Sequence, residues 1–178
     1  MATPIIFLLV TIAFSSSALI SAKSNTNIIQ STCKTTHYYN LCVSILKSDP
    51  RSRTADTKGL AAIMVGVGMT NATSTATYIS GNLIAATHDP VLTKVLQDCS
   101  DKYTLAADSL RLTIQDLDHE TYDYASMHVL AAADYPNVCR NIFQRAKGFV
   151  YPAEIRGREE SLKRICSVSS GIIDRLVE

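Results

Sequence analysis

Apolar residues recur at intervals of three and four positions along most of this chain, and no other feature of the sequence constrains its fold more strongly. That interval marks one face of an α-helix, whereas a half-buried strand would alternate every two residues. Four long segments carry such a stripe, and short connections separate them. The sequence therefore predicts an all-α protein, an up-and-down four-helix bundle.

Each stripe identifies residues expected to face the core. In the first two segments they are Ala62, Val65, Met69, Ala72, Ala76, Ile79, Leu83 and Ala86, then Leu92, Leu96, Cys99, Tyr103, Ala106, Leu110 and Ile114. In the last two they are Tyr122, Ala125, Val129, Ala132, Pro136, Cys139, Phe143 and Ala146, then Leu162, Ile165, Ser169, Ile172 and Leu176. Asp89 before Pro90 predicts one helix start, and Asp118 is placed to cap the third helix. Pro136 is expected to kink or restart that helix.

Residues 59–88 contain no Asp, Glu, Lys or Arg, which makes this stretch a candidate for a membrane span. A span needs ~20 mostly apolar residues. The stretch instead carries many Thr, Ser and Asn side chains, among them Thr70, Asn71 and Thr73. We therefore assign it to the first helix of the bundle.

The N-terminus predicts entry into the secretory pathway. Residues 5–14 form an apolar core, and small residues follow where a signal peptidase can cut. We expect residues 1–22 to be a signal peptide, which leaves one mature domain, residues 23–178. The chain has 17 basic and 16 acidic residues without a block of like charge, so neither nucleic acid nor a membrane is an expected partner of the mature protein.

Cysteines of secreted chains tend to pair, so Cys33 and Cys42 predict a disulfide that staples a small helical extension before residue 50. In the chain-entropy model, closing a loop of ~10 residues contributes ~2.7 kcal/mol. Cys99 and Cys139 lie on the stripes of neighbouring helices, where a second bridge is geometrically reasonable, although four cysteines allow three pairings. Cys166 is then a buried thiol.

No combination of residues indicates an enzyme, a metal site or a cofactor site. The cysteines and histidines lack zinc-finger spacing, C-x-x-C is absent, and no G-x-S-x-G marks a hydrolase nucleophile. A secreted helical carrier that holds a lipid or hormone between its helices is one alternative. Alanines on the stripes, such as Ala72 and Ala132, instead favour close helix approach with little cavity.

Four segments occur in an order and spacing typical of one protein family. They are CKTTHYYNLC (residues 33–42), SDPRS (48–52), DCSDKYTLAADSL (98–110) and CRNIF (139–143). On these segments the chain resembles the plant invertase and pectin methylesterase inhibitors, over essentially the whole mature length. Within that family it is similar to the inhibitors of beta-fructosidase.

The resemblance implies a four-helix bundle with an N-terminal helical hairpin, the disulfides Cys33–Cys42 and Cys99–Cys139, and a free Cys166. It also implies an inhibitor and not an enzyme. The expected partner is an acid invertase (beta-fructofuranosidase), bound one to one with its sucrose-binding cleft covered; the alternative partner is a pectin methylesterase. The expected location is the vacuole or the cell wall.

The resemblance further places a candidate target interface at the start of the third helix. In cell-wall invertase inhibitors a Pro-Lys-Phe motif there reaches the carboxylate pocket of the enzyme, and the aligned residues here are Tyr122, Asp123 and Tyr124. Aspartate replaces the lysine, and Tyr-Asp followed by alanine is more similar to the methylesterase inhibitors, so both targets stay open. Tyr122 lies on the core stripe, whereas Asp123 and Tyr124 lie off it. His119 and Glu120 complete the candidate interface.

Two residues, His119 and Asn71, carry separate hypotheses. His119, at the expected cap of the third helix, would be mostly protonated in an acidic compartment because histidine titrates near pH ~6.5, and its charge would strengthen binding to an acidic cleft. The alternative is a solvated cap residue. Asn71 begins an Asn-Ala-Thr sequon and is a candidate glycosylation site, although it flanks the stripe of an expected helix.

Overall fold

The computed structural model describes residues 27–177, and the regular secondary structure in that range is helical, without strands. The expected signal peptide, residues 1–22, lies outside the described residues. Residues 27–33 and α2 (Tyr39–Ser48) form an N-terminal hairpin, and a 3-10 helix, η1 (Pro50–Arg53), follows. The long helices are α3 (Thr57–Tyr78) with its π-helical end η2 (Ile79–Ile84), α4 (Pro90–Asp118), α5 (Tyr122–Arg145) and α6 (Ala153–Ile173), after which a 3-10 turn, η3 (Asp174–Leu176), closes the described chain.

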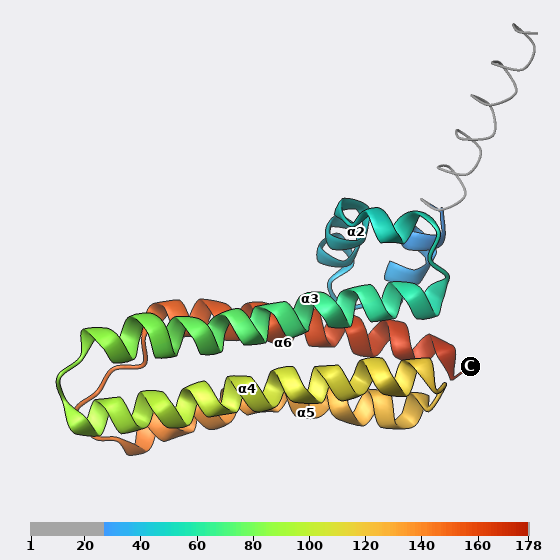
Figure 1. The fold of residues 1–178 in the computed structure, drawn as a ribbon. Helices are drawn as coiled ribbons and strands as arrows, with labels where there is room; N and C mark the ends of the chain where they lie inside the picture. Colours follow the sequence, from blue (N-terminus) through green and yellow to red (C-terminus); the bar gives the residue numbers. More distant parts are fainter. Residues whose placement is uncertain (1–26, 178) are drawn as a thin grey trace, which may run out of the picture.

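The four long helices run up and down beside one another (Figure 1). In chain order α3 packs on α4, α4 on α5 and α5 on α6, and α6 returns to α3. The N-terminal hairpin packs on α3 and α6, at the end of the bundle where the C-terminus lies (Figure 1). The predicted four-helix bundle with a helical N-terminal extension is confirmed.

The core follows the predicted stripe closely in α4 and less closely in α3. Cys99, Tyr103 and Leu110 of α4 are fully buried, as expected. In α3 the predicted Ala62 and Met69 are only half-buried, whereas Leu60 and Met64 are fully buried. Because α3 packs against α4, α6 and the hairpin at once, its buried face is wider than a single stripe.

Aspartates begin two of the long helices. The Asp56 carboxylate accepts a hydrogen bond from the Gly59 backbone N–H at 2.8 Å, and Asp89 accepts from Val91 and Leu92 at 2.8 and 3.0 Å. The Asp89 cap was predicted correctly. These carboxylates satisfy N–H groups that have no partner within the helix.

Two predictions about α5 were wrong. Asp118 does not cap this helix; it is the last residue of α4, and α5 begins at Tyr122. Of the two outcomes expected at Pro136, a kink or a restart, the restart does not occur, because α5 continues from Tyr122 to Arg145 with Pro136 buried inside it. The proline removes one helical hydrogen bond, but packing against α4 and α6 keeps the helix in one piece.

Two disulfides fasten this arrangement. One joins Cys33 to Cys42 and closes the N-terminal hairpin; the other joins Cys99 of α4 to Cys139 of α5, across a sequence separation of 40. Cys166 on α6 is a free, buried cysteine. Burial raises the pKa of its thiol to about 12, so the thiol stays protonated at physiological pH.

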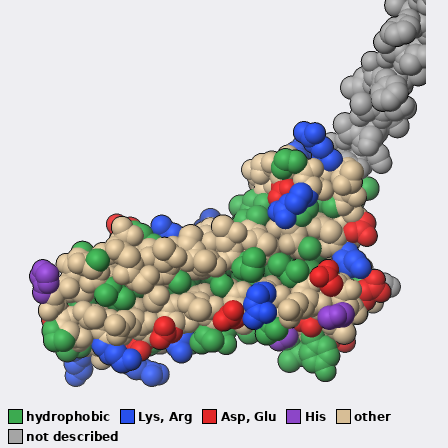
Figure 2. All heavy atoms as spheres, in the orientation of Figure 1, with side chains coloured by type: hydrophobic (Ala, Val, Ile, Leu, Met, Phe, Trp, Pro, Cys, Tyr) green, Lys and Arg blue, Asp and Glu red, His purple; other side chains and the backbone are tan. Residues whose placement is uncertain are grey.

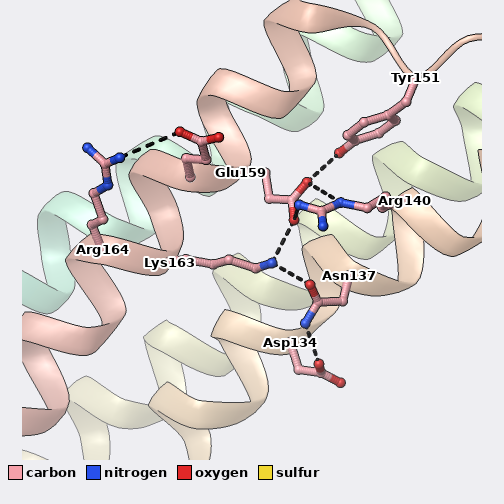
Figure 3. A network of polar contacts seen from close by, with 8 residues as sticks. Asp134, Asn137, Arg140, Tyr151, Glu159, Lys163 and Arg164 are labelled. Atoms are coloured by element: carbon pink, nitrogen blue, oxygen red, sulfur yellow. Dashed lines mark hydrogen bonds and ion pairs between the residues drawn. The ribbon is translucent and has the colours of Figure 1, made fainter.

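A carboxylate with no solvent exposure, that of Glu159 on α6, holds α6 against α5 (Figure 3). It accepts hydrogen bonds from the Arg140 guanidinium of α5, from the Lys163 ammonium one helical turn away at 2.6 Å, and from the Tyr151 hydroxyl at 3.0 Å. Burial, reinforced by the neighbouring Tyr103 and Glu159, raises the pKa of Tyr151, which therefore remains a proton donor. A buried charge needs such partners to offset its lost hydration.

The same network continues along α5. Lys163 also donates to the side-chain oxygen Oδ1 of Asn137, and the side-chain Nδ2 of Asn137 donates to the Asp134 carboxylate at 2.8 Å (Figure 3). Polar contacts therefore join α6, the α5–α6 connection and two turns of α5. Since these groups meet only at one axial position of the two helices, they fix how far α6 can slide along α5.

We predict that Glu159→Gln lowers the free energy of unfolding by about 2 kcal/mol. The substitution keeps the shape but removes the charge from between Arg140 and Lys163, whose side chains are partly exposed and can be partly rehydrated, so the loss falls below the ~3–5 kcal/mol typical of a broken buried pair. Urea unfolding followed by circular dichroism measures the change. Glu160→Gln is the matched control, because this neighbour is 56% exposed and its ion pair with Arg164 should contribute little. Equal stability of the two variants would contradict the prediction.

Candidate functional site

The connection between α4 and α5 carries the candidate interface residues, and its backbone has a defined geometry. The Glu120 N–H donates to the Leu117 carbonyl at 3.2 Å, and the Thr121 N–H donates to the Asp116 carbonyl at 2.9 Å. Glu120 itself has φ 60°, the left-handed conformation. This pair of bonds is the Schellman motif, which usually places glycine at the left-handed position. The turn explains why α4 extends to Asp118, so that a cap for α5 cannot form there.

Side chains from three helices fix this turn. Asp116 of α4 accepts a hydrogen bond from the Thr121 hydroxyl at 3.2 Å, and its other carboxylate oxygen lies 2.6 Å from Nδ1 of His128 on α5. Lys58 of α3 donates to Glu120 at 3.0 Å, which raises the pKa of the lysine. The tip of the α4–α5 hairpin is thus attached to α3 and α5 as well as to α4.

The structure brings most of the predicted interface residues together. Glu120, Tyr122, Asp123 and Tyr124 surround a shallow depression that is completed by Thr121 and Val177. Tyr122 is half-buried against the core, in keeping with its place on the stripe, while Asp123 is exposed and Tyr124 is 60% exposed.

The position of His119 corrects one expectation. The residue is not at the start of α5; it is the C-cap of α4, exposed to solvent, and it does not line the depression. His119 therefore does not cap the N-terminus of α5.

Sequence reasoning missed the residues that support this tip. Lys58 lies far away in sequence and carries no local signal. Asp116 and His128 are 12 residues apart, and only the reversal of the chain at the Schellman turn brings them together. The left-handed Glu120 was equally hidden, since glycine or asparagine would have been the recognisable signal.

Asn71 lies in the middle of α3, on the side that faces α6. Its side-chain Nδ2, the atom to which an N-linked glycan would be attached, donates to the Ser161 hydroxyl of α6 at 3.3 Å, and its Oδ1 is buried. A glycan on Nδ2 would replace this contact between helices. The geometry argues against the sequence-based glycosylation candidate.

Residues 27–177 contain neither a cluster of metal ligands nor a helix that could span a membrane. No group of three or more His, Cys, Asp or Glu side chains there is arranged to hold a metal ion. None of the helices in that range is both long and apolar enough to cross a membrane.

The fold and the disulfide positions define a known class of helical inhibitors. The chain belongs to the plant invertase/pectin methylesterase inhibitor family, whose model matches residues 27–172. It is 77% identical to the cell wall/vacuolar inhibitor of fructosidase 2 of Arabidopsis thaliana across the full length of both chains. It is 40% identical to pectinesterase inhibitor 28 of Oryza sativa subsp. japonica, over 82% of this chain and 67% of that protein.

Solved structures agree with the fold. A crystal structure of a mutant pectin methylesterase inhibitor from Arabidopsis superposes with a TM-score of 0.65, covering 80% of this chain and 92% of that one at 20% identity. A second structure, of a pectin methylesterase inhibitor from Arabidopsis thaliana, gives a TM-score of 0.61 at 19% identity, with 83% and 95% covered. At such identities the likeness establishes the bundle and says nothing about the target.

We predict that Glu120→Asn is more stable than Glu120→Gln by about 1 kcal/mol. Both substitutions remove the ion pair with Lys58, but asparagine tolerates the left-handed backbone better than glutamine does. Urea unfolding of the two variants isolates this difference, because the lost ion pair cancels between them. Equal stability would show that the turn does not hold Glu120 in an unfavourable conformation.

A second prediction concerns Asn71. We expect the protein secreted from a plant host to carry no glycan at this position, because the Nδ2 atom is engaged with α6. Intact mass and gel mobility should be the same before and after treatment with peptide-N-glycosidase, and Asn71→Gln should differ in mass from the wild type by one methylene group only. A mass shift on treatment that Asn71→Gln abolishes would contradict this expectation.

Proposed function

We propose that this protein inhibits an acid invertase (beta-fructofuranosidase), binding it one to one and covering its sucrose-binding cleft. The observation that carries the proposal is the 77% identity, over the full length of both chains, to a protein named as a cell wall/vacuolar inhibitor of fructosidase.

The α4–α5 tip is the proposed contact surface, with Glu120, Asp123 and Tyr124 as its exposed residues and His119 at its border. Tyrosine is a frequent anchor of protein interfaces because it presents a large, rigid side chain. The Schellman turn and the Asp116–His128 contact hold this surface in shape before binding, which reduces the entropy lost on association.

The aspartate at position 123 has a consequence for the binding mechanism. A cation placed in the carboxylate pocket of a glycosidase would be attracted to it, whereas a carboxylate would be repelled. We therefore infer that this chain covers the cleft chiefly through Tyr124 and the tip backbone, with Asp123 directed to the rim of the cleft.

Secretion is part of the same proposal. Residues 1–22 are proposed to be cleaved as a signal peptide, which would deliver residues 23–178 to the cell wall or the vacuole. The name of the relative that is 77% identical contains both places. The oxidising pathway to either place also suits two disulfides.

A pectin methylesterase is the second candidate target. It is favoured by the 40% identity to a pectinesterase inhibitor and by the Tyr-Asp pair at the tip, which resembles the methylesterase inhibitors. The methylesterase is the second candidate because the identity to that inhibitor, 40%, is lower than the 77% identity to the inhibitor of fructosidase.

An inhibition assay with both enzymes tests the proposal. We expect refolded, oxidised residues 23–178, titrated at acid pH, to abolish vacuolar or cell-wall invertase activity at a one-to-one ratio and to leave a plant pectin methylesterase active. Tyr124→Ala should weaken inhibition about tenfold or more, as expected for an interface anchor. The control Val150→Ala changes a side chain that is 84% exposed, at a distance from the tip in sequence. Inhibition of the methylesterase alone would replace the first candidate by the second.

A further inference from the structure

Three large apolar side chains stand on the outer face of α5. Tyr124, Met127 and Leu130 are 60%, 63% and 60% exposed, more than any other large hydrophobic residue carried by a helix within residues 27–177. Their spacing of three residues places them along one side of the helix. We call these three residues the α5 ridge. A cluster of hydrophobic side chains protrudes from the end of the bundle where α5 begins (Figure 2).

The ridge is not explained by the fold. The inner face of α5 already buries Ala125, Val129 and Ala132 in the core. A helix of a bundle normally carries polar side chains on the opposite face, and here that face is apolar over the first half of the helix. Contiguous exposed apolar surface of this kind marks an interaction site in many proteins.

The ridge is continuous with the α4–α5 tip. Tyr124 belongs to both, because it lines the depression beside Glu120 and also begins the ridge. From the tip the surface extends two helical turns along α5, to Leu130. Asp123 and Asp134, both exposed, lie near its two ends.

We propose that the α5 ridge is a second part of the target contact, in which Met127 and Leu130 dock into an apolar groove beside the cleft of the invertase. The proposal rests on the function proposed above and adds the chemistry of the partner surface. Because carboxylates border the ridge, the groove should be apolar at its centre and carry lysine or arginine at its rim. Methionine and leucine suit such a groove, since methionine adapts to irregular surfaces.

A second copy of this chain fits the ridge less well. If two copies paired antiparallel about Met127, Tyr124 would face Leu130 of the other copy, but Asp134 would face its Glu120, and like charges repel. The three half-exposed side chains would also supply only on the order of 300 Å² per copy, whereas a stable interface needs ~800 Å² per partner. With an enzyme as partner, the tip adds the missing area.

The test uses Met127→Glu, Leu130→Glu and the double variant, with Tyr124 and the tip unchanged. The control is Val91→Glu, at the start of α4, whose valine is 57% exposed and which introduces the same charge. We expect the inhibition constant against invertase to rise about tenfold for each single variant and further for the double variant, while Val91→Glu matches the wild type. Met127→Ala and Leu130→Ala, which favour helix, should each cause a smaller rise.

The outcomes separate the two proposals. Circular dichroism and thermal melting must be unchanged, as expected for exposed positions, and the alanine variants supply the test if a glutamate variant is unfolded. If the wild type inhibits invertase and the folded ridge variants inhibit it equally well, the ridge is not a contact and only this inference fails. If the wild type inhibits no invertase, both proposals fail. Sedimentation that shows a wild-type dimer, lost in Met127→Glu, would assign the ridge to a second copy and overturn the inference.

Discussion

The buried carboxylate of Glu159 is the constraint on which the rest of the bundle depends. Four long helices packed side by side have similar apolar surfaces along their length, so burial alone resists sliding poorly. Besides Lys163 of its own helix, Glu159 needs Arg140 of α5 and Tyr151 of the α5–α6 connection, and both reach it at one register of α6 against α5. The Cys99–Cys139 disulfide likewise fixes the position of α5 along α4, here by a covalent bond. The position of α5 is therefore determined from both sides.

That double attachment also positions the proposed contact surface. The tip lies at the connection between α4 and α5, the ridge follows along the first half of α5, and the tip is held further by Asp116, His128 and the contact between Lys58 and Glu120. A surface held in this way loses little conformational freedom on binding. Under the proposed function, specificity depends on the side chains displayed at this surface, such as Asp123, and needs no rearrangement of the bundle.

The sequence predicted those features that depend on local pattern. The stripe of α4 and the cap at Asp89 were found because each is encoded within one or two turns. The buried face of α3 was found only in part, since its width depends on three neighbours that packing brings together. The cap at Asp118 and the restart at Pro136 were predicted wrongly because tertiary contacts outweighed local preference. The left-handed Glu120 and the exposure of Met127 and Leu130 followed from no pattern, although the Tyr122–Tyr124 segment was located through family resemblance.

The burial of the free thiol of Cys166 also affects the two disulfides. A fifth cysteine in an oxidising compartment can attack either disulfide as a thiolate and exchange partners with it. In the native bundle its thiol is 1% exposed and, with a pKa of about 12, almost never ionised. The completed core therefore protects the pairing of the other four cysteines. The wrong cysteines can therefore pair only before α6 docks. Once α6 has packed, it prevents exchange of the two native disulfides.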